Sequence, residues 1–207
     1  MIERACIMGA IIAGGRATRM GGVNKPLKWA GNQPLILHAY QRMEPQASGI
    51  IVNANRDQRE ISALVPSGTA IVEDDPEFAG RGPLVGLLAC LAHARSNDFK
   101  FLATAAADTP FFPADLIDQL RAPIGDGAIR IARHDGWRHP LFGLWPTSLM
   151  ENLETFLYSH ETNKVMAFAK RHDLIEVDIE AKGSPFFNVN TPNDLAQADE
   201  MLQKMRS

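Results

Sequence analysis

ACIMGAIIAGG (residues 5–15) is a nearly continuous apolar run that ends at a pair of glycines. A strand buried in a parallel sheet has this composition, because helices cover both faces of such a sheet. We therefore expect a strand over Ala5–Ile12, followed by a loop. In α/β proteins, ligands bind at the carboxyl ends of such strands, so the loop is a candidate binding segment.

Strand-like and helix-like segments alternate along the rest of the chain. We expect further strands at 49–54, 69–73, 99–105, 129–133, 140–145 and 174–179. We expect helices at 34–43, 58–64, 83–94, 113–121, 149–158, 164–171 and 191–205. Thr191 and Pro192 have the residue types of an N-cap and a first helical position. The alternation predicts an α/β fold, with a mostly parallel central sheet and helices on both faces.

Composition narrows the class of protein. A chain of 207 residues suits a single domain over 1–207, and its 45% hydrophobic content is ordinary for a globular protein. The net charge of −3, without a long basic run, argues against a nucleic-acid partner. No apolar stretch reaches membrane-spanning length, and Glu3 disagrees with a signal peptide, so we expect a cytoplasmic protein that binds no membrane. Cys6 and Cys90 lack zinc-site spacing and are expected to be buried free thiols.

The loop after the first strand combines four glycines with Arg16, Arg19 and Lys25. Glycines let backbone N–H groups approach an anion, and the basic side chains can neutralise phosphate charge. The spacing matches neither a Walker loop nor a GxGxxG dinucleotide fingerprint. A plain basic loop with turn glycines is the alternative interpretation.

Acidic residues follow two other expected strands. Asp74 and Asp75 come after the strand at 69–73, and Asp108 comes after the strand at 99–105. Mg²⁺ prefers one or two carboxylates together with phosphate oxygens, so these positions could hold it. Turn chemistry is the competing explanation for all three. Gly82 directly precedes the helix expected from Pro83, whose N-terminus could meet an anion or a base edge.

Two later segments carry polar side chains. His139 begins an expected strand, and a lone histidine is more often structural than catalytic. Asn188 and Asn190 alternate along an extended segment and should share one side of it. They could contact a polar ligand or a metal shell, or only cap the last helix. No covalent-nucleophile constellation stands out, which argues against a hydrolase of that kind.

Four segments together resemble the molybdenum cofactor guanylyltransferases. They are AGGRATRMGGVNK (13–25), GPLVG (82–86), DTPF (108–111) and FFNVNTPNDL (186–195). The first and last are specific, and the other two are shared with nucleotidyltransferases of the same fold. The resemblance extends over nearly the whole chain. It implies a Rossmann-like nucleotidyltransferase fold, with the nucleotide-binding part at about 1–110 and the acceptor-binding part at about 111–207.

The resemblance also implies substrates and residue roles. GMP would pass from GTP to molybdopterin with release of pyrophosphate and with Mg²⁺ as cofactor. Catalysis would fall to Arg19, Lys25 and Asp108, with Asp108 as the metal ligand. The nucleotide would be held by Ile12, Ala13, Gly14, Gly15, Lys25, Asn53, Asp74, Gly82 and Asp108. Asn188 and Asn190 would lie near the acceptor or the metal, and molybdenum-insertion proteins and chaperones of molybdoenzymes would be partners.

Departures and rival functions accompany this interpretation. Ile12 stands where the family commonly has Leu, and Asn24 where it often has Asp. The nearest rivals are a cytidylyltransferase acting on the same pterin and a sugar-phosphate nucleotidyltransferase. The Ala-Gly-Gly at 13–15 favours guanine, because CTP-using relatives tend to have Ala-Ala-Gly. A non-catalytic nucleotide or cofactor carrier is the rival from another class, and the presence of both Lys25 and Asp108 argues against it.

Overall fold

A computed structural model describes residues 2–14, 25–122, 125, 127–159 and 162–206. Its strands are β1 Ile7–Ile12, β2 Trp29–Ala30, β3 Gln33–Pro34, β4 Ile50–Asn53, β5 Ala70–Val72, β6 Phe101–Ala106, β7 Ile129–His134, β8 Trp137–Pro146 and β9 Leu174–Asp178. Its helices are α1 Leu35–Met43, α2 Gln58–Leu64, α3 Pro83–Ser96, α4 Leu116–Arg121, α5 Met150–Tyr158, α6 Val165–Ala169 and α7 Pro192–Arg206. The elements alternate as the sequence predicts.

Seven strands form one sheet in the order β5-β4-β1-β6-β8-β7-β9. β1 lies between β4 and β6 and pairs parallel to both. β8 alone runs against its neighbours, antiparallel to β6 and to β7, while β7 and β9 are parallel. The prediction of a mostly parallel α/β sheet is therefore confirmed, with one reversed strand inside it.

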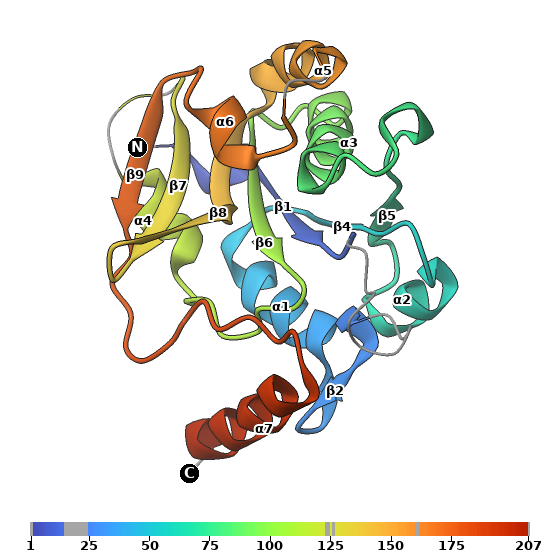
Figure 1. Cartoon of the computed structure of the whole chain (residues 1–207), viewed down its shortest axis with the longest axis vertical. Helices are drawn as coiled ribbons and strands as arrows, with labels where there is room; N and C mark the ends of the chain where they lie inside the picture. Colours follow the sequence, from blue (N-terminus) through green and yellow to red (C-terminus); the bar gives the residue numbers. More distant parts are fainter. Residues whose placement is uncertain (1, 15–24, 123–124, 126, 160–161, 207) are drawn as a thin grey trace.

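Alternate residues of β1 enter two different cores, as expected for a strand buried on both faces. Ile7 and Ile11 pack with the apolar sides of α1, α2 and α4. Met8, Ala10 and Ile12 pack with α3, α5 and α6. Figure 1 shows α3 and α5 on one side of the central strands and α1 on the other. The predicted covering of both sheet faces by helices is confirmed.

The last helix sits on a separate small core. Val189, Ala198 and Leu202 pack with Ala30 of β2, Leu35 and Phe111. In Figure 1, α7 lies at one end of the molecule beside β2. The hydroxyl of Thr191 accepts the N–H of Asp194 at 3.1 Å, which confirms the predicted N-cap. No helix in the described part of the chain is both long and apolar enough to span a bilayer.

Several predicted bounds were wrong for local reasons. Pro34 ends the short hairpin β2–β3, which the sequence did not indicate, and α1 begins one residue later. α4 begins at Leu116 because Pro113 opens a turn, closed by the Leu116 N–H to the Pro113 carbonyl. β8 begins at Trp137 rather than Pro140, and α6 is shorter than predicted. Cys90 is a buried free thiol as predicted, whereas Cys6 is only half-buried because it precedes β1 at the sheet edge.

Candidate functional site

The predicted site residues gather at one edge of the sheet. β1, β4, β5 and β6 are parallel, so Ile12, Asn53, Val72 and Ala106 all lie at their carboxyl ends. The Ala13 N–H donates to the Asn53 carbonyl at 2.9 Å, and the Ile12 carbonyl accepts the Ala107 N–H at 3.0 Å. Those two backbone groups therefore extend the sheet, and Gly14 follows as the first residue beyond it. Gly15 and Arg19 lie outside the described residues.

Lys25, Asp108 and Asn190 meet at this edge although they are far apart in sequence. The Lys25 ammonium lies 2.7 Å from Asp108 Oδ2 and 2.7 Å from Asn190 Oδ1. Only 20% of each side chain of the Lys25–Asp108 ion pair is exposed, so solvent screens the pair incompletely. The Val189 N–H donates to the Asp108 carbonyl at 2.9 Å and ties the two segments together. A cation thus already lies between two oxygen atoms of different segments.

Asn188 and Asn190 are both exposed, whereas Val189 between them is fully buried. This alternation confirms the prediction that the two amides share one side of an extended segment. The structure places Asn190 against Lys25, and the Asn190 side-chain amide donates to the Asn188 carbonyl at 3.5 Å. The roles of both residues toward an acceptor or a metal stay predictions.

Asp74 is held by two amides from the neighbouring strand β4 and its loop. Its Oδ1 accepts from Asn53 Nδ2 at 2.8 Å and its Oδ2 accepts from Asn55 Nδ2 at 2.7 Å. The Asn55 oxygen in turn accepts the Asp74 backbone N–H at 2.8 Å. The carboxylate is therefore fixed in direction before any ligand arrives. Asn55 was not among the residues expected from the sequence, although the Asn-Ala-Asn spacing after a strand was a usable signal.

The Asn53 side chain is completely buried and acts on Asp74 rather than on solvent. Its Nδ2 also donates to the Val72 carbonyl at 3.1 Å, while its Oδ1 has no hydrogen-bond partner among the described residues. Gly14 and Gly86 pack against that oxygen, since a Cβ at these positions would lie 2.9 Å and 2.3 Å from it. These two glycines therefore leave room for the amide, and the predicted contact of Asn53 with a nucleotide stays a prediction.

Gly82 lies at the start of α3 with φ of 70°, a conformation that glycine adopts without strain. α3 is fourteen residues long, and its first turn carries no acidic residue. The partial positive charge at this end of the helix is thus suited to a negatively charged ligand. The prediction that Gly82 contacts the nucleotide stays untested.

The donor atoms at this edge fit a hard cation. Asp108 and Asn190 offer a carboxylate and an amide oxygen, and both already face the Lys25 ammonium. Mg²⁺ takes one or two carboxylates plus phosphate oxygens, so two protein oxygens suffice. Among the described residues no cluster of three or more His, Cys, Asp or Glu could hold a metal without such additional ligands. The arrangement therefore favours a metal that arrives with a nucleotide.

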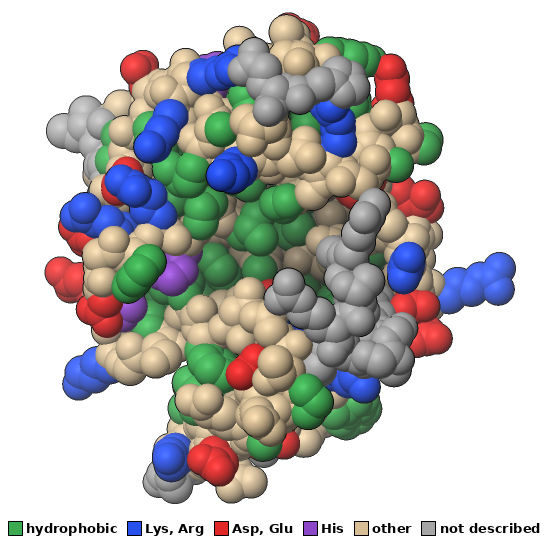
Figure 2. All heavy atoms as spheres, viewed as in Figure 1, with side chains coloured by type: hydrophobic (Ala, Val, Ile, Leu, Met, Phe, Trp, Pro, Cys, Tyr) green, Lys and Arg blue, Asp and Glu red, His purple; other side chains and the backbone are tan. Residues whose placement is uncertain are grey.

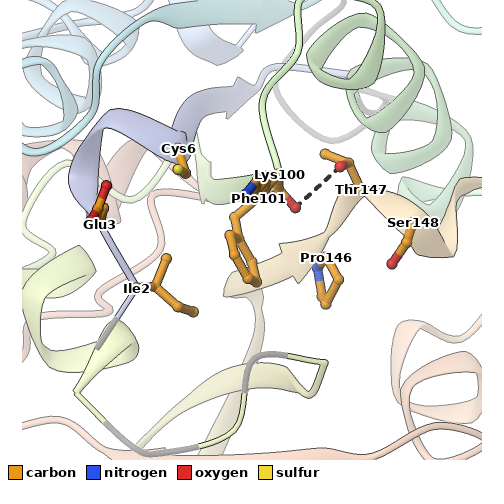
Figure 3. A pocket seen from close by; sticks show the side chains of 8 residues that line it. All are labelled: Ile2, Glu3, Cys6, Lys100, Phe101, Pro146, Thr147 and Ser148. Carbon is orange, nitrogen blue, oxygen red and sulfur yellow. Dashed lines mark hydrogen bonds between the residues drawn. The ribbon is translucent and has the colours of Figure 1, made fainter.

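A pocket of about 530 Å³ lies at the opposite edge of the sheet. It is lined by residues before β1, at the start of β6 and at the end of β8, and Figure 3 shows Cys6, Lys100 and Thr147 among them. The Thr147 hydroxyl donates to the carbonyls of Phe99 and Lys100, at 2.8 and 3.1 Å. None of the predicted site residues lines this pocket, so it is separate from the candidate site.

The fold and this edge define a class of protein. A parallel α/β sheet carries a glycine-rich strand end, a paired lysine and aspartate, and a second carboxylate braced by amides. This combination is that of a nucleotidyltransferase, in which transfer depends on phosphate alignment and charge neutralisation.

Comparisons with known proteins specify the family. Residues 9–175 match the model of the MobA-like NTP transferase domain. A molybdenum cofactor guanylyltransferase of Mesorhizobium japonicum is 40% identical over 99% of this chain and 100% of that protein. One from Cereibacter sphaeroides is 36% identical over 96% of this chain and 98% of its own length. The chain belongs to the molybdenum cofactor guanylyltransferase family, and the resemblance noted in the sequence is confirmed.

Solved structures agree on the fold. Molybdopterin-guanine dinucleotide biosynthesis protein A from Archaeoglobus fulgidus superposes with a TM-score of 0.75 at 23% identity, covering 96% of this chain and 100% of that one. A Mycobacterium tuberculosis protein solved in complex with manganese gives a TM-score of 0.68 at 16% identity, over 96% of this chain and all of that one. At these identities the likeness supports the Rossmann-like nucleotidyltransferase fold alone.

Proposed function

We propose that this enzyme transfers GMP from GTP to the phosphate of molybdopterin, forming the guanine dinucleotide cofactor and releasing pyrophosphate. Family membership supports the substrates, since full-length relatives carry the name molybdenum cofactor guanylyltransferase. The observation that carries the chemistry is the meeting of Lys25, Asp108 and Asn190 within hydrogen-bond distance. Three separate sequence motifs thereby converge on one point.

The reaction needs no general base in this scheme. An oxygen of the acceptor phosphate is already a nucleophile and forms a bond to the α-phosphorus of GTP. The bond from that phosphorus to the β-phosphate oxygen breaks, and pyrophosphate leaves with the electron pair. The chain's task is to align the two phosphates and to neutralise their charge.

Lys25 is the described cation best placed for that task. Its ammonium is already at the edge where β1 and β6 end, and it can move from Asp108 to a phosphate oxygen as a point charge. Mg²⁺, held by Asp108 and the nucleotide, would supply Lewis-acid stabilisation of the phosphates. Arg19 is proposed to join Lys25 at the leaving pyrophosphate. The first half of the chain, about 1–110, binds the nucleotide, and the remainder binds the acceptor.

Asp74 is proposed to bind the nucleotide through its fixed carboxylate. Both of its oxygens already accept amide hydrogen bonds, so the carboxylate loses little further conformational entropy when a ligand binds. The side-chain amides of Asn53 and Asn55 hold the carboxylate in place through these hydrogen bonds. In this scheme Asp74, Asn53 and Asn55 act as positioning groups, and the nucleotide and the acceptor phosphate supply the reacting atoms.

The first experiment is nucleotide binding by calorimetry, comparing GTP with CTP, ATP and UTP in the presence of Mg²⁺. Binding of GTP in clear preference supports guanylyl transfer, whereas a preference for CTP would replace it by cytidylyl transfer. Pyrophosphate release with GTP and molybdopterin then tests the acceptor. Lys25→Ala and Asp108→Ala should each lower turnover by about a hundredfold or more, against Lys100→Ala at the opposite edge as a charge-matched control.

A further inference from the structure

Four aromatic rings form a cluster on β7, β8 and the segment that leads to α7. His139 stacks on Phe186 with ring centroids 4.1 Å apart and an interplanar angle of 21°. Phe142 meets the Phe186 ring edge-on at 4.8 Å, and His134 does so at 6.1 Å. Phe186 and Phe142 are buried, whereas His139 is only half-buried. The imidazole is therefore the outer layer of this stack.

The cluster lies at the edge of the sheet that carries the nucleotide site. β8 runs antiparallel to β6, so its first residues lie beside the carboxyl end of β6, from which Asp108 follows. An irregularity in β8 supports a special role for its start. The partners of β7 jump from Gly143 to His139 between Ile131 and Ala132, which leaves three residues of β8 unmatched. Such bulges occur beside active sites, where they re-aim a side chain.

Chain connectivity limits the distance between this cluster and the reacting groups. Phe186 is four residues before Asn190, whose side chain contacts Lys25. Four residues of extended chain span at most about 14 Å. Molybdopterin carries its phosphate on a methylene of a pyran ring fused to the pterin. The distance from its pterin ring to its phosphate therefore fits within the limit between Phe186 and Asn190.

The surface at this edge is hollowed rather than filled. Figure 2 shows a hollow between the part of the molecule that carries α3, α5 and α6 and the part that carries α7 and β2. Hydrophobic side chains line its floor, and histidine side chains lie at one border. A flat heteroaromatic ligand suits such a surface, because one face can stack while its polar edge stays in water.

We propose that the half-buried face of His139, backed by Phe186, is the platform on which the pterin ring of the acceptor stacks. This inference rests on the proposed function, because it takes molybdopterin as the acceptor. Burial lowers the pKa of His139, with His134 adding to the effect, so the stacking ring is uncharged at neutral pH. The platform holds the pterin while Lys25 and Asn190 face the phosphate end.

If the stack were only structural, losing the His139 ring would not affect molybdopterin binding, so a control histidine elsewhere in the chain is needed. A second histidine–phenylalanine pair, Phe168 with His172, has centroids 4.7 Å apart and lies near α6, away from this edge. His172 is also partly buried, with its pKa lowered mainly by burial. It therefore serves as a control, since losing it removes a histidine–phenylalanine contact, here tilted by 58° rather than stacked, but no proposed ligand contact.

The test is binding of metal-free molybdopterin, measured anaerobically by calorimetry, with GTP binding measured separately in the same way. His139→Ala should weaken molybdopterin binding about tenfold, as loss of a stacking side chain does for a nucleobase. His139→Phe keeps a flat ring and should stay within about threefold of the wild type. His172→Ala should bind like the wild type, and GTP affinity should be unchanged in all three.

Equal molybdopterin binding by His139→Ala and the wild type would overturn the platform while leaving the proposed function intact. So would an equal loss in His139→Ala and His139→Phe, because the ring would then not matter. Failure of the wild type itself to bind molybdopterin, with GTP still bound, would refute the acceptor instead. If His139→Ala does not fold, His139→Gln removes the ring but keeps a polar side chain and is judged by the same comparison.

Discussion

The carboxylate of Asp194 holds the backbone of Asn190 from the first turn of α7. Its Oδ2 accepts the N–H groups of Asn190 and Thr191, both at 2.8 Å. The Thr191 hydroxyl accepts the Asp194 N–H in return. This reciprocal capping arrangement fixes the start of the helix and, with it, the residue whose side chain faces Lys25.

Replacing Asp194 should therefore affect both the helix and the site. Asp194→Ala should lower the melting temperature and reduce kcat/KM about tenfold, because Asn190 loses its fixed position without losing its amide. Glu200→Ala, an exposed carboxylate on the same helix, is the control. Thermal melts and steady-state kinetics measure the two effects. An unchanged kcat/KM together with a lowered melting temperature would show that α7 capping is independent of the site.

The Lys25 ammonium lies between Asp108 Oδ2 and Asn190 Oδ1, in a position that a metal ion could also occupy. Lys25→Met should bind Mn²⁺ in the absence of nucleotide at least about tenfold more tightly than the wild type, or about 1.4 kcal/mol. The reason is that the ammonium repels a second cation at Asp108. Electron paramagnetic resonance of free Mn²⁺ measures the affinity. A lower affinity in Lys25→Met would mean that Lys25 does not compete with the metal.

Gly86 leaves no space for a side chain. A Cβ there would lie 2.3 Å from Asn53 Oδ1 and 2.9 Å from its Cγ, so the amide that braces Asp74 must move. Gly86→Ala should lower the free energy of unfolding by about 2 kcal/mol and weaken nucleotide binding. A Cβ at Gly127 would meet no atom of the described chain within 4 Å, so Gly127→Ala should change stability by less than about 0.5 kcal/mol. Urea unfolding distinguishes the two, and equal stability of both variants would contradict the packing argument.

Two histidines make the free energy of unfolding depend on pH in the mildly acidic range. Burial lowers the pKa values of His139 and His172 below 6.5, the ordinary value. Between the lowered and the ordinary pKa the unfolded chain binds more protons, so the free energy of unfolding decreases as pH falls below about 6.5. The decrease stops once the folded histidines are also protonated. Urea unfolding between pH 7.5 and 5, at about half-unit intervals, should show a smaller slope in His139→Phe and in His172→Phe.

The order of strands and helices was readable because buried strands are apolar throughout and helices repeat every 3.6 residues. The direction of β8 was not, since an apolar strand of 140–145 has the same composition in either direction. Its true start at Trp137 was missed because Arg138 and His139 separate this residue from the apolar run that begins at Pro140. The hairpin β2–β3 was missed because two-residue strands are too short to show alternation.

The site was predictable as residue types but not as contacts. Lys25 and Asn190 are 165 positions apart, and only the folded sheet edge brings them together. The motif containing Asn53 suggested a ligand contact, whereas its amide is turned inward to Asp74. The sequence favours a structural role for His139, because its stack on Phe186 forms only when the segment before α7 folds back beside β8. Side-chain direction at such positions follows from tertiary packing, which periodicity does not encode.

Because β8 is reversed, changes at its start can occur independently of changes in the loops that follow β1, β4 and β6. The residues proposed to bind the nucleotide follow strands that end at the edge of the candidate site, whereas β8 starts there, directly after the turn at Asp135 and Gly136. Changes in the length or sequence of that hairpin tip should alter the proposed acceptor side without disturbing β1, β4 or β6. Enzymes of this fold could thus acquire new acceptors by exchanging one hairpin, and a library confined to residues 134–139 is the direct way to look for them.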